Sequence, residues 1–185
     1  MYQIAPVSAG EDKRQKTDKG NPKDHGSRGE NMRLRAMAKI NLALDVLGRR
    51  PDGYHDVRMI MQTVTMYDDI ELKRKASPGI ELRTTLPYIP TDERNLAYRA
   101  ALLLMEEFGV KEGLRIDLHK FIPVSAGLAG GSTDAAAVLV GVNSMFRLGL
   151  SQEELMKRGA SLGADVPFCV MRGTALAEGI EFEQF

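Results

Sequence analysis

The chain of 185 residues has a single cysteine, no excess of either charge and no long apolar run. One thiol, Cys169, excludes an internal disulfide or a metal site of several cysteines and fits a reducing cytoplasm; we expect it to be a small buried residue. Acidic and basic residues both number 25, so the net charge favours neither nucleic acid nor an anionic membrane as a partner. No run approaches the ~18 apolar residues that span a bilayer. These absences favour a globular protein that binds neither nucleic acid nor an anionic membrane.

Residues 1–31 differ in composition from the rest of the chain. They are rich in Lys, Asp, Gly, Asn and Ser and contain few large apolar groups, so we predict a disordered extension. The segment lacks the apolar stretch of a signal peptide, and its mixture of charges is unlike a transit peptide. An added leader or a start codon assigned too early would explain it, with Met32 as the natural start. The ordered part is then residues 32–180, which has the size of one domain.

The spacing of apolar residues in this part alternates between strand and helix periods. From Leu34 to Leu44 they fall at every second place, which predicts a strand over 33–48 with one buried face. A helical period predicts helices at 95–109, 133–147 and 151–162. The third begins with a capping box whose first residue is Ser151. Further strands are predicted at 57–66, 69–75, 79–85, 113–120, 166–171 and 174–179. This mixture argues for the α+β class.

A glycine-rich stretch, PVSAGLAGGSTD at 123–134, leads directly into the second predicted helix. Successive backbone N–H groups in such a turn, followed by a helix N-terminus, form a site for phosphate. Ser132 and Thr133 could cap the helix, bind a metal ion or contact phosphate oxygens, and Asp134 is expected to be an ordinary residue of the first helical turn. Alternatively, the glycines only serve a tight turn and Ser132 is its N-cap. Because no lysine follows the glycines, the stretch is not a Walker A loop.

Other stretches supply the charge that the loop lacks. The alternation in AMAKINLAL places Lys39 beside Asn41 on the polar face of the first strand, and LGADVPFCV places Asp165 in a short turn before an apolar run. Each could equally be a solvated charge. The turn RRPDGYHDV presents Tyr54 and His55, which could stack on and hydrogen-bond to a heterocycle or be ordinary turn residues.

Taken together and in this order, AKINLALDVLGRRPDGYHDV, PVSAGLAGGSTDAAA and GADVPFCVMRGTALAEG closely resemble the GHMP small-molecule kinases. The resemblance runs from Arg33 to Ile180. The glycine-rich motif by itself indicates only the superfamily. Pro-Asp-Gly-Tyr-His combined with Gly-Ala-Asp-Val-Pro points to members whose substrate carries a cytidine.

The resemblance implies a domain like the second domain of ribosomal protein S5, with ATP and Mg²⁺ as co-substrate and cofactor. It implies that Asp165 is the catalytic base facing the substrate hydroxyl and that Lys39 steadies the transferred phosphoryl group. Asn41, Tyr54 and His55, together with Asp165, match substrate-binding positions. Ser132 is the candidate magnesium contact. The matching ATP-binding positions are Asn95, Lys120, Pro123, Val124, Ser125, Ala126, Gly127, Leu128, Ala129, Gly130, Gly131, Ser132 and Thr133.

The resemblance also implies a second domain after the last predicted strand, whereas residues 181–185 do not match the family. We therefore expect a shortened chain that exposes apolar surface otherwise covered by the missing domain. Three interpretations stay open: the cytidine-linked kinase or its amino half, a related kinase acting on another alcohol such as homoserine or mevalonate, and a catalytically silent nucleotide-binding fragment. The sequence does not predict the oligomeric state.

Overall fold

The computed structural model describes residues 31–49, 55–178 and 181–184. Within these ranges the strands are β1 (Asn31–Arg49), β2 (His55–Lys75), β3 (Ile80–Thr84), β4 (Gly113–His119), β5 (Thr174–Glu178) and β6 (Glu181–Gln184). The helices are α1 (Leu96–Glu107), α2 (Gly130–Met145), α3 (Gln152–Ala160) and α4 (Val166–Met171). The α+β class predicted from the sequence is confirmed.

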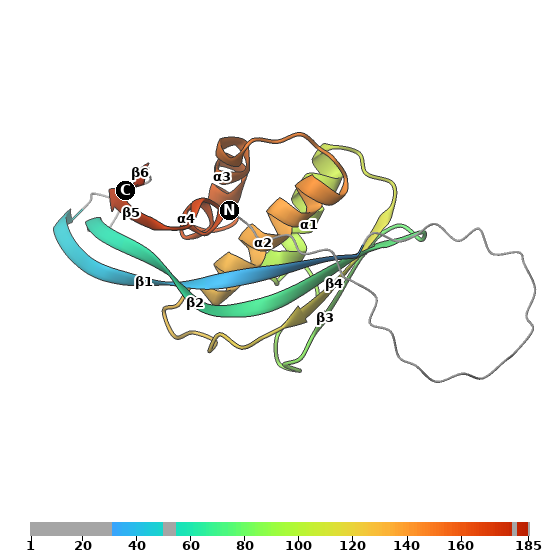
Figure 1. Cartoon of the computed structure of the whole chain (residues 1–185), viewed down its shortest axis with the longest axis horizontal. Coiled ribbons are helices and arrows are strands. Elements are labelled where there is room, and N and C mark those ends of the chain that lie inside the picture. Colours follow the sequence, from blue (N-terminus) through green and yellow to red (C-terminus); the bar gives the residue numbers. More distant parts are fainter. Residues whose placement is uncertain (1–30, 50–54, 179–180, 185) are drawn as a thin grey trace, which may run out of the picture.

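One sheet carries all of these strands, and β2 is its centre. Strand β1 pairs with one edge of β2, while β4 and β5 share the other edge; β3 extends the sheet beyond β4, and β6 extends it beyond β5. The pairing of β3 with β4 is parallel and the other pairings are antiparallel. The two strands predicted at 57–66 and 69–75 are therefore one continuous strand. All four helices lie on one side of this sheet (Figure 1).

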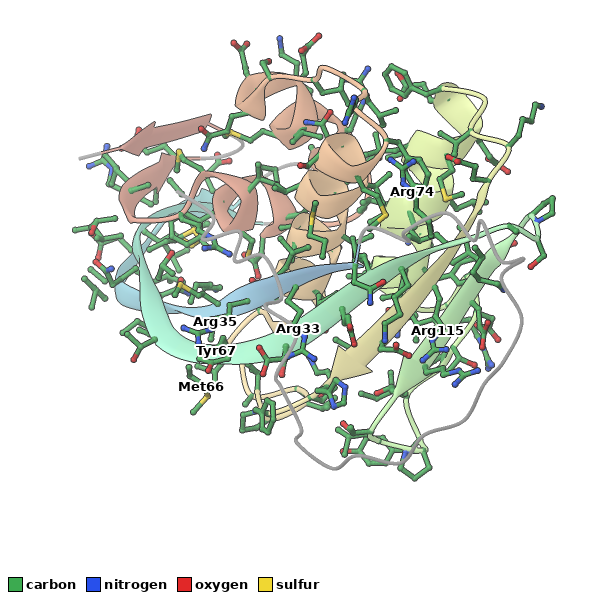
Figure 2. The ribbon with its side chains drawn as sticks, turned by 45° about the vertical axis from the view of Figure 1, so that its right-hand side comes forward. Arg33, Arg35, Met66, Tyr67, Arg74 and Arg115 are labelled. Carbon is green, nitrogen blue, oxygen red and sulfur yellow. The ribbon has the colours of Figure 1, made fainter. Side chains whose placement is uncertain are left out.

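The two faces of the sheet differ in chemistry. The helix side is apolar, and α2 packs so closely on it that a Cβ atom at Gly141 would come within 2.4 Å of Leu72 Cδ1. The opposite side is charged: Lys73 Nζ lies 2.7 Å from Glu71 Oε2 and 3.1 Å from Asp117 Oδ2. Arg33, Arg35, Tyr67 and Arg115 are labelled in Figure 2 and lie on this open face. A sheet with one apolar and one charged face needs helices on one side alone.

Two predicted elements are corrected by the structure. The run VPFCVM at 166–171 is not a strand but the short helix α4, with Pro167 in its first turn. Its first five residues, from Val166 to Val170, are all buried, so the run has no polar face from which a period could be read. Helix α2 begins at Gly130 rather than at residue 133, because Ala129 in the left-handed region already starts it. The capping box at Ser151 is confirmed.

The buried face of β1 is shorter than predicted. Leu34, Ala36 and Ala38 are fully buried, whereas Leu42 is 58% exposed and Leu44 is 50% exposed. Here the paired strands β1 and β2 extend past the helices (Figure 1), so this part of β1 has no helix to cover it. Large apolar side chains are therefore exposed at this end of β1. Among the described residues, no helix combines the length and apolarity needed to cross a membrane.

Candidate functional site

A cavity of about 630 Å³ lies where β1, the glycine-rich loop, the start of α1 and the turn before α4 meet. It brings together residues that are far apart in the chain and that the sequence singled out one by one. These are Lys39, Asn41, Asn95, Lys120, Pro123, Val124, Ser125, Ala126, Gly127, Leu128, Ala129, Gly130, Gly131, Ser132 and Asp165.

The glycine-rich loop ends in an open helix N-terminus. Ser125, Gly127 and Ala129 have positive φ angles, and Ala129 is the N-cap of α2. Within the described part of the chain, the Ala129 cap brings no side-chain hydrogen bond to the first N–H groups of α2. Ser132 is therefore not the N-cap but a residue of the first turn, which corrects that alternative. N–H groups in this position are suited to bind an anion such as phosphate.

Contacts with β1 hold the loop in place on its inner side. The N–H of Lys39 donates to the carbonyl oxygen of Leu128 (3.2 Å), and the hydroxyl of Thr133 donates to the carbonyl oxygen of Met37 (2.6 Å). Thr133 is thus buried against β1 and, unlike its neighbours in the loop, is not one of the described residues that line the cavity. The loop also packs tightly at Gly130, where a Cβ atom would lie 3.2 Å from both Ile122 Cγ2 and Lys120 Nζ.

Lys39 and Asp165 meet across the cavity. Lys39 Nζ lies 3.7 Å from Asp165 Oδ2 and donates to Asn41 Oδ1 at 3.2 Å. The Lys39 side chain is 7% exposed and the Asp165 side chain 38% exposed. The interpretation of Lys39 as a solvated charge is therefore wrong. Its burial comes from an irregularity in the pairing of β1 with β2 between Met37 and Lys39, where Ala38 and Lys39 are both buried.

Asp165 lies at the start of α4, and its carboxylate makes no capping hydrogen bond to the described helix. It is the N-cap residue of α4, but within the described chain its side chain does not cap the helix; its carbonyl oxygen accepts from the N–H of Cys169 at 3.0 Å. The carboxylate is therefore left to face the cavity and Lys39. A carboxylate beside an ammonium group at the rim of a cavity can accept a proton from a bound hydroxyl.

A buried charge cluster that the sequence did not predict lies behind the loop: Asp68 on β2, Lys120 after β4 and Asp134 in α2. Lys120 Nζ pairs with both Asp68 Oδ2 and Asp134 Oδ2, and the three side chains are at most 4% exposed. Burial raises the pKa of Asp134 to about 8, with Lys120 opposing this effect and Asp68 adding to it. Burial by itself would lower the pKa of Lys120, but the two carboxylates raise it overall.

Asp134 thus differs from the ordinary first-turn residue that the sequence suggested. Its Oδ1 atom is buried and has no hydrogen-bond partner among the described residues. One signal in the sequence could have revealed the cluster. Asp68 has the same parity in β2 as the buried residues Ile70 and Leu72, so it is an acidic residue on an apolar face.

Cys169 is buried, as predicted from the sequence. Its side chain lies within α4, and burial raises the pKa of the thiol to about 12, with the negative charge of Asp165 adding to the shift. The thiol is therefore protonated at neutral pH and is not a nucleophile.

The structure does not describe the side chains of the two remaining predicted substrate residues. Tyr54 falls outside the described residues. His55 is the first residue of β2, but its side chain is also outside the described part. The proposed pair therefore stays a prediction.

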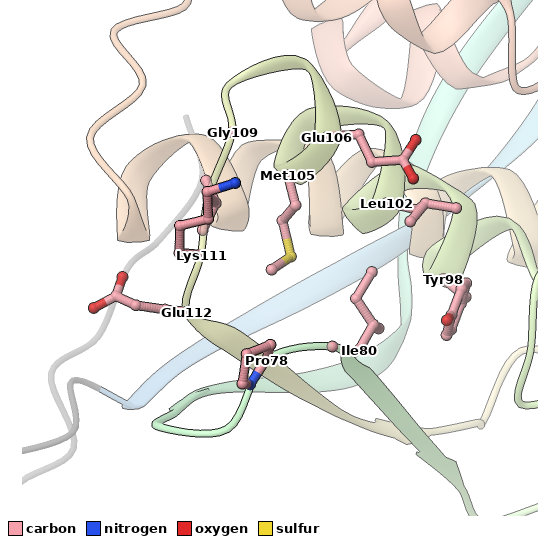
Figure 3. A pocket seen from close by; sticks show the side chains of 11 residues that line it. Pro78, Ile80, Tyr98, Leu102, Met105, Glu106, Gly109, Lys111 and Glu112 are labelled. Atoms are coloured by element: carbon pink, nitrogen blue, oxygen red, sulfur yellow. The ribbon is translucent and has the colours of Figure 1, made fainter.

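A second hollow, of about 360 Å³, lies between α1 and the start of β3 (Figure 3). Tyr98, Leu102 and Met105 of α1 face Ile80 across it, and Glu106, Lys111 and Glu112 stand at its rim. The described lining of this hollow has neither an open helix N-terminus nor a charged pair that points inward. The cavity at the glycine-rich loop is therefore the better candidate site.

The described residues contain no group of three or more His, Cys, Asp or Glu side chains that could hold a metal ion. Ser132 lines the cavity, and Asp134 and Asp165 are the carboxylates in its lining. The hydroxyl of Ser132 and the carboxylates are oxygen donors, the ligand type that Mg²⁺ prefers.

Comparisons with known proteins agree on one family. Residues 95–173 match the family described as GHMP kinases N terminal domain. The chain is 60% identical over 149 residues to 4-diphosphocytidyl-2-C-methyl-D-erythritol kinase of Caldicellulosiruptor bescii, covering 80% of this chain and 52% of that protein. It is 56% identical over 147 residues to the enzyme of the same name from Lachnoclostridium phytofermentans, covering 80% of this chain and 50% of that protein. The chain thus spans about half the length of these relatives.

Solved structures give the same picture. A crystal structure of 4-(cytidine 5'-diphospho)-2C-methyl-D-erythritol kinase superposes with a TM-score of 0.73 at 37% identity, covering 83% of this chain and 55% of that one. Homoserine kinase from Cytophaga hutchinsonii superposes with a TM-score of 0.67 at 18% identity, covering 89% of this chain and 54% of that one. The second likeness is one of fold alone.

Proposed function

Because the chain belongs to the GHMP kinases, we propose that it acts in the ATP-dependent phosphorylation of 4-diphosphocytidyl-2-C-methyl-D-erythritol at its 2-hydroxyl group, a step in isoprenoid precursor synthesis. The substrate is the one named for the curated relatives with 60% and 56% identity. The chain covers about half of those relatives, so catalysis by these 185 residues is itself part of the proposal.

One observation supports the proposal most: the open N-terminus of α2 and the pair of Lys39 and Asp165 share one cavity. The N–H groups of the helix and of residues 123–132 provide a site for the ATP phosphates. Asn95 lies in the same lining and is the proposed contact near the base, and Lys120 is the other proposed residue of the ATP site outside the loop. A phosphate site without a Walker lysine needs positive charge from elsewhere, and Lys39 is close enough to supply it.

The roles of the side chains follow from the chemistry of phosphoryl transfer. Its transition state spreads negative charge over the peripheral phosphate oxygens, so catalysis depends mainly on positioning and electrostatic stabilisation. Lys39 would stabilise that charge, and Asp165 would orient the substrate hydroxyl and accept its proton. Asn41, Tyr54 and His55 would hold the cytidine-bearing substrate. A bound Mg²⁺ would neutralise phosphate charge, and Ser132 is the residue proposed to contact it.

The test uses the full 185-residue chain with labelled ATP, Mg²⁺ and three substrates in parallel. We expect label transfer to 4-diphosphocytidyl-2-C-methyl-D-erythritol and none to homoserine or mevalonate. Transfer to either of the other alcohols would instead identify a related kinase.

Titration calorimetry with ATP separates the remaining alternative. Binding of ATP without any phosphorylated product would identify a catalytically silent nucleotide-binding chain. Absence of ATP binding would contradict the proposed function altogether.

A further inference from the structure

We propose that Asp68, Lys120 and Asp134 form a positioning cluster that holds the glycine-rich loop in its binding shape from below. The inference rests on the proposed nucleotide site and gives Lys120 a specific part in it. On this view the ammonium group of Lys120 acts on the nucleotide through the loop and not by direct contact.

Asp68 ties the entry of the loop to the central strand. Its Oδ1 atom accepts hydrogen bonds from the N–H groups of Phe121 (2.5 Å) and Ile122 (2.8 Å). Its side chain is fully buried in β2, which pairs with β1, β4 and β5. The first residues of the loop are thus fixed to the most extensively paired strand of the sheet.

Lys120 connects Asp68 to the end of the loop, where α2 begins. Its Nζ atom pairs with Asp68 and lies 2.7 Å from Asp134 Oδ2 in the second turn of α2. The backbone just before the segment 123–129 is therefore bonded to Asp68, and the helix just after it is joined to the same Asp68 through Lys120. Because that ammonium group is 4% exposed and paired with two carboxylates, its charge is already neutralised by the protein.

The loop needs such support because its backbone is strained. Ser125 and Ala129 are non-glycine residues in the left-handed region, which persist when the surroundings hold them there. Gly130 passes so close to Lys120 Nζ that a Cβ atom would lie 3.2 Å from it. The cluster therefore lies directly beneath the point where the strained loop becomes helix.

The test measures amide hydrogen exchange by NMR in the full chain, together with ATP affinity by calorimetry. The informative amide is that of Lys39, which donates to Leu128 in the middle of the loop and is not bonded to the cluster. Asp68→Asn keeps the size and an acceptor oxygen but turns an amide group toward Lys120. We expect the amides of Phe121, Ile122 and Lys39 to exchange about ten-fold faster and the Kd for ATP to rise about ten-fold.

A second variant guards against misfolding of the first. Lys120→Met combined with Asp134→Asn removes the connection while leaving Asp68 in place to accept from the N–H groups of Phe121 and Ile122. Here only the Lys39 amide should exchange about ten-fold faster, again with about ten-fold weaker ATP binding. Asp69→Asn, at the exposed neighbour of Asp68, is the matched control and should change neither quantity.

The outcomes are distinguishable. Exchange at Lys39 within two-fold of wild type in both variants, or a loss of protection that spreads equally through α3, would overturn the positioning role. An unchanged Kd in variants of a chain that binds ATP would do the same. If the wild-type chain binds no ATP, the proposed function fails, and the exchange at Lys39 still decides whether the cluster positions the loop.

Discussion

At the scale of single residues, the proposed role of Asp165 as catalytic base can be tested apart from nucleotide binding. Its carboxylate faces Lys39 at 3.7 Å, whereas the proposed phosphate site is formed by the loop and the start of α2. We therefore expect Asp165→Asn to lower turnover at least about 100-fold, the usual effect of losing a general base, with the Kd for ATP nearly unchanged. Turnover is followed with labelled ATP, and Glu153→Gln on the exposed side of α3 is the control. Near-normal turnover would refute the base assignment.

Cys169 gives a second prediction at this scale. Because burial raises its pKa to about 12, the folded protein holds a protonated thiol where an unfolded chain would begin to ionise several pH units lower. A thiol reagent at pH 8 should therefore react slowly with the native chain and at least about 100-fold faster in denaturing urea. Rapid reaction of the native chain at pH 8 would show that the thiol is accessible.

The sequence identified candidate residues that the structure brings into one cavity, but it did not predict their surroundings. Lys39 and Asp165 were identified from short motifs, but the burial of Lys39 depends on a local irregularity in strand pairing that no periodicity reports. Asp68 was not identified because its partners lie 52 and 66 positions further along the chain, at Lys120 and Asp134. A cluster assembled from β2, the segment after β4 and α2 becomes visible once the strand order is known.

At the scale of elements, α3 depends on its cap. Ser151 Oγ accepts from the N–H of Glu154 (3.2 Å), and the Ser151 N–H donates to Glu154 Oε2 (2.8 Å). Ser151→Ala removes one of these bonds, so we expect a loss of about 1 kcal/mol in the free energy of unfolding, measured by urea denaturation. Ser144→Ala, at an exposed position in α2, should cost nothing measurable. Equal effects of both substitutions would contradict the role of the cap.

Boundaries of elements were predicted well where a chemical signal marks them. The capping box located α3, whereas α2 begins earlier than predicted because a left-handed Ala129, which sequence rules do not favour, starts it. The run 166–171 was assigned the wrong element because six apolar residues without a polar face fit a strand or a buried helix equally well. Pro167 was the available sign of a helix start.

At the scale of the whole molecule, the end of β1 exposes several large apolar side chains. Leu42, Leu44, Val46 and Leu47 are each at least 50% exposed on this one strand. Contiguous exposed apolar side chains favour self-association. We expect Leu42→Thr combined with Leu44→Thr to shift the chain toward the monomer in sedimentation velocity. Tyr88→Thr, at an exposed residue of a loop, is the control, and an unchanged distribution for the double variant would exclude this surface.

The class of the fold followed from periodicity, but the arrangement of the strands did not. Periodicity shows which residues share a face and contains no information on which strands are neighbours. The segments 57–66 and 69–75 form one long strand, β2. Because of this length, β2 pairs with β1, β4 and β5.

The bond between the Lys39 N–H and the Leu128 carbonyl has a mechanical consequence. One residue holds the loop with its backbone and reaches Asp165 with its side chain. The distance from the loop to the ammonium group is therefore set by the length of one lysine side chain, and burial limits the rotamers of that side chain. We expect movement of β1 to displace both together, so that the separation between the proposed phosphate site and the ammonium group varies less than the position of either.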